Sequence, residues 1–172
     1  MLRTLDKIHM AGELVLRAAA TFRSAQTVGD FASAVVLAGA AQGIVVPFLE
    51  EAGIDSSELR MAKTIAHIQQ RNIAAMTPDD WDKLLAETKR FTRAIYNGLK
   101  HAGDHRRKVA LLPSNDRFID ANLENEAELL ISETINDLRA VPLYLPDVLS
   151  VEALELVQSA WVSPDQNAHG RV

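Results

Sequence analysis

The segment Thr77-Pro78-Asp79-Asp80-Trp81 begins a stretch that ends with Tyr96-Asn97-Gly98-Leu99-Lys100-His101-Ala102-Gly103. Its spacing predicts one long helix over residues 77–105. Thr77 can cap the helix start, Pro78 has the backbone angle favoured at the first helical position, and the two aspartates place negative charge beside the positive helix end. Gly103 is a candidate left-handed residue, so we expect the helix to end there.

Apolar side chains recur in this stretch every three or four residues, which predicts one buried face: Trp81, Leu84, Leu85, Thr88, Phe91, Ile95 and Leu99. A rotation of about 100° per residue places a polar stripe opposite that face. The polar stripe consists of Arg90, Arg93, Asn97, Lys100 and His101. It is the candidate functional site, and the alternative is a solvated surface without function.

The composition limits the classes of function that this chain can have. Apolar residues make up 48% of the 172 residues and aromatic residues 5%, which favours close-packed helices over stacking platforms for single-stranded nucleic acid. The net charge of −5 provides no overall basic surface, so any nucleic-acid contact would be a local patch. The chain has no cysteine and no signal-peptide pattern at residues 1–7, so we expect a cytoplasmic protein.

Hydrophobic periodicity predicts further helices before and after the long one. They cover about residues 5–22, 31–52, 56–76, 124–141 and 150–161, with Gly53 ending the second and Asp55-Ser56-Ser57-Glu58 starting the third. We therefore predict an all-α, single-domain bundle of four principal helices plus accessory helices over residues 1–162. A polar C-terminal tail is expected at residues 163–172.

The segment from Phe31 to Leu49 contains no charged residue and has two interpretations. Its length and the Gly39-x-x-x-Gly43 spacing are compatible with a membrane span. Its moderate hydrophobicity, its acidic flanks and the lack of a basic anchor favour a buried central helix, which we expect. Pro47 is expected to kink its last turn.

The helix near residues 124–141 is expected to carry an acidic outer face made of Glu124, Glu126, Glu128, Glu133 and Asp137. Such a face could dock a basic protein partner. Another alternative is metal chemistry, because His101 and His105 have the spacing of an H-x-x-x-H site. Gly103 between them would end the helix and no third ligand is evident, so we expect no metal and no cofactor.

The polar stripe continues into Arg106, Arg107 and Lys108, which are candidate nucleic-acid-binding residues together with Arg90. A histidine near neutral pKa can exchange a proton, while lysine and arginine stabilise a phosphoryl oxyanion. Those two abilities suffice for metal-independent RNA cleavage, in which the 2′-hydroxyl group is the nucleophile. The candidate catalytic residues are therefore His101, Asn97, Lys100 and Arg93.

Residues 91–102, Phe91-Thr92-Arg93-Ala94-Ile95-Tyr96-Asn97-Gly98-Leu99-Lys100-His101-Ala102, resemble the motif helix of the HEPN superfamily of small all-helical prokaryotic domains. The segment Ala38-Gly39-Ala40-Ala41-Gln42-Gly43-Ile44 is similar to a small-residue helix of its uncharacterised members. The resemblance implies a homodimer whose motif helices face each other, in toxin, defence or RNA-processing systems. Asn97 and His101 match the polar residue and the histidine of the motif.

The chain departs from the motif at Tyr96, which occupies the position of the arginine found in active members, while Arg93 lies one turn earlier. Ribonuclease activity is therefore not implied, although any enzymatic activity would be that of a metal-independent endoribonuclease. We expect a HEPN-like homodimer outside the membrane, with RNA or a protein as its partner. The alternative is a structural interaction module that uses the acidic helix.

Overall fold

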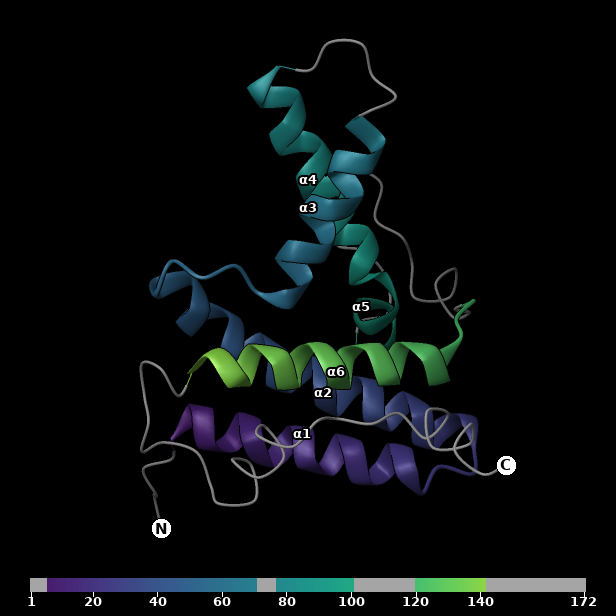
Figure 1. Cartoon of the computed structure of the whole chain (residues 1–172). Helices are drawn as coiled ribbons and strands as arrows, with labels where there is room; N and C mark the ends of the chain where they lie inside the picture. Colours follow the sequence, from purple (N-terminus) through teal and green to yellow (C-terminus); the bar gives the residue numbers. More distant parts are fainter. Residues whose placement is uncertain (1–5, 71–76, 101–119, 142–172) are drawn as a thin grey trace, which may run out of the picture. The chain divides into compact units, whose positions relative to one another are not determined.

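The computed structural model describes residues 6–70, 77–100 and 120–141 (Figure 1). These residues form six helices and no strand, which confirms the predicted all-α fold class. In chain order the helices are α1 (Lys7–Arg23), α2 (Val28–Glu51), α3 (Ser57–Gln70), α4 (Pro78–Thr92), α5 (Ala94–Lys100) and α6 (Leu123–Ala140).

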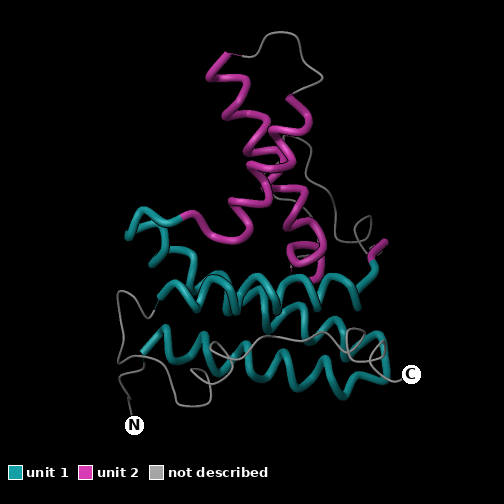
Figure 2. Tube along the Cα trace, viewed as in Figure 1, with its two compact units in different colours: residues 1–54, 122–172 teal, residues 55–121 magenta. Residues whose placement is uncertain are grey.

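The chain divides into two compact units (Figure 2). The first unit consists of residues 1–54 and 122–172, and the second consists of residues 55–121. Helices α1, α2 and α6 therefore belong to the first unit, and α3, α4 and α5 to the second. One bundle over residues 1–162 stays a prediction. The helix expected at 150–161 and the tail at 163–172 lie outside the described residues.

Side-chain caps determine where the helices of the first unit begin. Asp6 caps α1, and Asn122 caps α6. Thr27 and Asp30 form a capping box at the start of α2, in which each side chain accepts a hydrogen bond from the other residue's backbone N–H. The short connection over residues 24–27 makes α1 and α2 antiparallel neighbours. These local signals are all readable in the sequence.

The core of the first unit lies between α1, α2 and α6 and is rich in alanine, as the composition predicts. Small side chains let the helix axes approach closely, and each fully buried isoleucine or leucine contributes about 1.5–3 kcal/mol. The fully buried apolar residues include Ile8, Ala11, Val15 and Ala18 of α1, Ala34, Val35, Ala38, Ala41, Val45 and Leu49 of α2, and Ala127, Ile131, Ile135 and Leu138 of α6.

Helix α2 is long and apolar enough to cross a membrane by length and composition. A core helix of a soluble protein passes the same test, so this finding does not assign a membrane. Pro47 lies inside the helix, which continues to Glu51. Gly53 has a φ of 70° directly after it, so the predicted stop at this glycine is confirmed.

Polar side chains connect α2 to α6 inside the core. The Nε2 atom of Gln42 donates a hydrogen bond to Oε2 of Glu133 at 3.2 Å, and both side chains are buried. The hydroxyl of Thr134 donates to the carbonyl oxygens of Leu130 and Ala38 at 2.7 and 3.3 Å. A buried hydrogen bond between two elements stabilises one relative register of the two helices, because a shift would leave its polar atoms unsatisfied.

The structure corrects the prediction that the outer face of α6 carries all five acidic residues. Glu133 and Asp137 are buried, with Asp137 only 1% exposed. A helical wheel places both residues at the edge of the apolar stripe that includes Leu130, and Gln42 of α2 contacts Glu133 there. The helical periodicity identified the stripe correctly, but the width of the surface that α2 covers could not be derived from α6 alone.

Local caps are equally clear in the second unit. The Oγ atom of Ser56 accepts the backbone N–H of Leu59 at the start of α3. Thr77 and Asp80 form a capping box at the start of α4, with Pro78 as its first residue, as predicted. Helices α3 and α4 pack on each other, Ala62, Ala66 and Thr88 are buried, and the ring centroids of His67 and Trp81 lie 4.6 Å apart.

The single long helix predicted over residues 77–105 is wrong, because α4 ends at Thr92 and α5 begins at Ala94. Arg93 lies between them with φ and ψ of −102° and 7°, outside the helical region. The Thr92 hydroxyl donates to the carbonyl oxygen of Lys89 at 3.0 Å, a local bond of the kind that competes with helical bonding. The expected end at Gly103 lies outside the described residues.

The hydrogen bond between Gln42 and Glu133 can be tested by stability. We expect Gln42→Ala to lower the free energy of unfolding by about 2–3 kcal/mol, because it removes a bond to a buried carboxylate and leaves a cavity. Gln26→Ala is the matched control, since Gln26 is exposed and its loss should change stability by at most about 0.5 kcal/mol. Urea unfolding followed by circular dichroism measures both, and equal stabilities of the two variants would contradict the structural role of Gln42.

The cap of α2 predicts a pH dependence. Hydrogen bonds from the backbone of Gln26 and from Thr27 lower the pKa of Asp30 below its usual value. A carboxylate with a lowered folded-state pKa stabilises the fold above its unfolded-state pKa, and this contribution is lost as the pH falls through the lower folded-state pKa. We therefore expect the melting temperature of Asp30→Asn to fall less than that of the wild type between about pH 5 and pH 2. An equal decrease of the melting temperature in the variant and in the wild type over this pH range would contradict the prediction.

Candidate functional site

The segment from Thr88 to Lys100 carries cations without any acidic residue. Its cations are Lys89 and Arg90 in the last turn of α4, Arg93 at the break, and Lys100 at the end of α5. Positive side chains near a helix C-terminus are favoured by the helix dipole, so part of this pattern stabilises α4 and α5 themselves. The exposure of each side chain determines which of these cations can bind a ligand.

Arg93 forms an ion pair with Glu58 of α3 instead of belonging to an outward stripe. The Glu58 side chain is 4% exposed and that of Arg93 is 30% exposed, so the pair is largely shielded from water. A buried carboxylate without a cation would be costly, and Arg93 offsets that cost. The prediction that Arg93 shares the outward face of Asn97 and Lys100 is therefore wrong, and its guanidinium group holds α3 against the end of α4.

Asn97 and Lys100 are exposed on α5, as predicted, and Arg90 is exposed on α4. The ammonium group of Lys100 lies 5.6 Å from the centroid of the Tyr96 ring, a distance at which a cation–π contact is favourable. Tyr96 itself is buried. The Tyr96 ring therefore lies near Lys100 and is not part of the polar surface.

Phe91 differs most from the prediction that the apolar face of residues 77–105 is buried. Its side chain is 78% exposed, whereas Thr88 is buried and Trp81 and Leu85 are partly buried. A helical wheel puts Trp81, Leu85 and Thr88 in one narrow seam, and Phe91 lies roughly 60–80° to its side. An aromatic ring in the last turn of α4, which also carries Lys89 and Arg90, is thus presented to solvent.

Several predicted site residues lie outside the described residues: His101, Arg106, Arg107 and Lys108, as well as His105 of the alternative metal site. Among the residues that the structure does describe, no group of three or more histidine, aspartate or glutamate side chains is arranged to hold a metal ion. Within those residues the site is therefore a surface of single side chains on α4 and α5, and its described members are Arg90, Phe91, Asn97 and Lys100.

The acidic surface of α6 is smaller than the sequence suggested. Glu124 is exposed, whereas Glu126 and Glu128 are half-buried and Glu133 and Asp137 belong to the core. Burial raises the pKa of Glu126 above its usual value, because desolvation disfavours the charged carboxylate. This loss of exposed charge weakens the case for α6 as a docking face for a basic partner.

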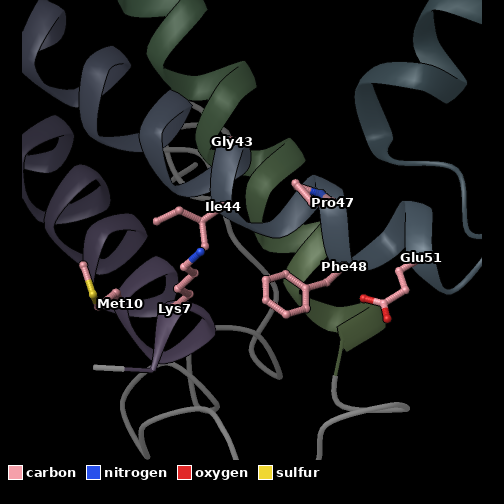
Figure 3. Close-up of a pocket in the computed structure, with 7 residues that line it drawn as sticks. All are labelled: Lys7, Met10, Gly43, Ile44, Pro47, Phe48 and Glu51. Atoms are coloured by element: carbon pink, nitrogen blue, oxygen red, sulfur yellow. The ribbon is translucent and has the colours of Figure 1, made fainter. Parts of the chain in front are cut away.

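A groove of about 540 Å³ lies in the first unit, and none of its lining residues is a predicted site residue (Figure 3). Its lining is mainly apolar and comes from the first half of α1 and the second half of α2: Lys7, Met10, Gly43, Ile44, Pro47, Phe48 and Glu51. The sequence signal for it was the absence of charge from Phe31 to Leu49, which was interpreted as a buried central helix in preference to a membrane span and not as the wall of an open groove.

Three features of these surfaces were missed by sequence reasoning: the Glu58 partner of Arg93, the exposed ring of Phe91 and the groove. The sequence contained a signal for the first of these features. Glu58 is an acidic residue near the start of α3, but it was interpreted only as part of the helix start. Comparison of the chain with protein-family models, with curated proteins and with solved structures found no match.

The role of Arg93 can be tested by unfolding the second unit. We expect Arg93→Ala to lower its free energy of unfolding by about 1–3 kcal/mol, less than for a fully buried pair because water reaches the arginine. A Trp161→Phe background leaves Trp81 as the fluorescent reporter of this unit. Arg90→Ala is the control, with an expected change within about 0.5 kcal/mol. Equal effects of the two variants would show that the ion pair does not stabilise the unit.

Proposed function

We propose that this chain is a HEPN-like RNA-binding module that contacts single-stranded RNA through a basic surface of α4 and α5 and does not cleave it. The basic surface consists of Arg90, Phe91, Asn97 and Lys100, with His101 as its expected continuation. The observation that carries the proposal is the exposed ring of Phe91 in a segment, Thr88 to Lys100, that contains four cationic residues and no acidic residue.

The chemistry of these side chains supports contact with an unpaired nucleotide. An exposed phenyl ring can stack on a base, which is sequence-tolerant because every base has a π face. Arg90 and Lys100 can pair with phosphates, and the Asn97 amide can donate to or accept from a base edge or a 2′-hydroxyl group. Exposure of a large aromatic side chain costs hydrophobic stabilisation, which favours a functional reason for it.

Binding without cleavage is supported by the positions of Tyr96 and Arg93. Tyr96 stands where active members of the superfamily carry an arginine, and its ring is buried. Arg93 is the arginine nearest to Tyr96 in the sequence, but its guanidinium group forms an ion pair with Glu58. The remaining cation of α5, Lys100, could bind a phosphate but supplies no proton donor and acceptor pair of the kind that RNA cleavage requires.

The cellular location and the oligomeric state of the protein belong to the same proposal. We propose a cytoplasmic protein that forms a homodimer and does not insert into a membrane. The last point is supported by the buried hydrogen bond between Gln42 of α2 and Glu133 of α6, because α2 is the helix that would otherwise be the membrane candidate. The alternative function, docking of a basic protein by α6, has less support now that Glu133 and Asp137 belong to the core.

RNA binding is tested by fluorescence anisotropy with a labelled oligouridylate of about 12 nucleotides. We expect an affinity that falls with rising salt, because phosphate contacts release counterions. Phe91→Ala should weaken binding by about 5- to 100-fold through the loss of one stacked base, and Phe91→Tyr should restore it. Lys100→Ala and His101→Ala should each weaken it several-fold, with a smaller salt dependence for Lys100→Ala.

Lys83→Ala is the matched control, since Lys83 is an exposed cation on the first half of α4. It should bind the oligonucleotide as the wild type does, and gel electrophoresis should recover the RNA intact. Wild-type affinity in both Phe91→Ala and Lys100→Ala would refute the proposed surface. Cleavage that depends on His101 would refute the non-catalytic function.

A further inference from the structure

The backbone hydrogen bonds of α2 are interrupted beside the groove of the first unit. Pro47 lies inside the helix and has no backbone N–H, so the carbonyl oxygen of Gly43, four residues earlier, lacks its usual helical donor. Gly43 and Pro47 both line the groove, and both are exposed. If an apolar group covers this carbonyl oxygen, the covering group must also supply a donor. The groove therefore suits an occupant that combines apolar surface with a hydrogen-bond donor.

The groove has room for a large side chain next to Gly43 (Figure 3). A Cβ atom built on Gly43 would meet no atom of the described residues within 4 Å. The Phe48 ring, Ile44 and Met10 supply apolar lining around this space. A helix as apolar as α2 is normally covered on all sides, so an open apolar groove along it calls for an occupant.

Helix α6 ends at the same end of the first unit as the groove (Figure 1). Helix α1 begins at this end with Lys7, and α2 ends there with Glu51, and both of these residues line the groove. Helix α6 ends at Ala140, and residues 142–172, which follow it, are assigned to the same unit. The chain therefore continues from α6 at the end of the unit where the groove lies.

The segment predicted as a helix over residues 150–161 has the chemistry that the groove requires. It lies outside the described residues, and its sequence places Leu154, Val157 and Trp161 on one side of a helix, at intervals of three and four residues. The indole group of Trp161 is a large apolar ring with one N–H donor, which is usually hydrogen-bonded when the ring is buried. Trp161 thus combines both properties of the expected occupant.

The dimensions of the segment also fit. From Gly43 to Glu51 the groove follows α2 for about 12 Å, and a helix over residues 150–161 would be about 18 Å long. The connection over residues 142–149 can span at most about 29 Å. A segment tethered by so short a connection has an effective concentration of about a millimolar, which favours it over a free partner of weak affinity.

We propose that residues 150–161 of this chain cover the groove of α1 and α2, with the Trp161 ring in the free space beside Gly43. Its indole N–H then donates to the carbonyl oxygen of Gly43, which Pro47 leaves without a helical donor. Gly43 is small in this arrangement because the ring occupies the place of a side chain. This inference does not depend on the proposed contact of α4 and α5 with RNA.

The test uses the full chain with the substitution Trp81→Phe, which leaves Trp161 as the single tryptophan. We expect the emission of Trp161 to lie at a shorter wavelength than that of free tryptophan. Its quenching by acrylamide should be several-fold weaker than that of free tryptophan, because a covered ring has little contact with solvent. Both values should stay the same on dilution, since the contact is intramolecular.

Two variants in this background block the groove from different helices. Gly43→Leu places a side chain in the free space of the groove, and Met10→Glu places a carboxylate there from an exposed position of α1. Each should raise the acrylamide quenching of Trp161 several-fold without loss of the helical circular dichroism signal. Ala20→Leu is the matched control, because Ala20 is exposed in the last turn of α1 and does not line the groove, and it should leave the quenching unchanged.

A double-mutant cycle measures the contact itself. Trp161→Ala should lower the melting temperature of the wild type, but it should leave that of Gly43→Leu unchanged, because the ring has already lost its place there. Equal decreases in both backgrounds, or no decrease in either, would show that Trp161 does not contact the groove.

Three outcomes of the quenching experiment would overturn the proposal. The first is quenching of Trp161 as strong as that of free tryptophan. The second is protection that persists in both groove variants, which would place the ring elsewhere. The third is protection that appears only at high protein concentration or only with phosphatidylcholine vesicles, which would identify a second copy of the chain or a lipid as the occupant.

Discussion

Burial of polar groups between neighbouring helices is the constraint on which both units of this protein depend. In the first unit the core is built from alanine, valine, isoleucine and leucine, which specify little about register because their contacts are not directional. The hydrogen bonds of Gln42 with Glu133 and of Thr134 with the Ala38 carbonyl supply that specificity. A shift of α6 along α2 would leave a buried carboxylate without its amide partner.

The same principle acts through a charge pair in the second unit. Glu58 is buried near the start of α3, and Arg93 compensates it from the point where α4 ends. This pair takes Arg93 out of the outward surface at the residue where the helix is interrupted, while the cations Arg90 and Lys100 on either side of it are exposed. A residue that looks like part of a nucleic-acid site is therefore a structural one, while an expected core residue, Phe91, becomes available for contact with a ligand.

The basic surface and the groove offer different chemistry on different units. The basic surface of α4 and α5 offers cations and an aromatic ring, which suit a polyanion with unpaired bases. The groove of α1 and α2 offers a mainly apolar lining with one lysine and one glutamate.

Much of this protein follows from local patterns of residues. The cap at Thr77, the stop at Gly53 and the apolar periodicity of α1, α2 and α6 predict the helices and the all-α class, because each depends on residues within a few positions of one another. Contacts between distant segments were needed for the rest. The burial of Glu58 and Glu133 and the exposure of Phe91 depend on how far a neighbouring helix extends across a face. A helical wheel gives the direction of a side chain, but it does not show how far a neighbouring helix covers that side. For this reason the sequence predicted the fold class but not which residues form the candidate site.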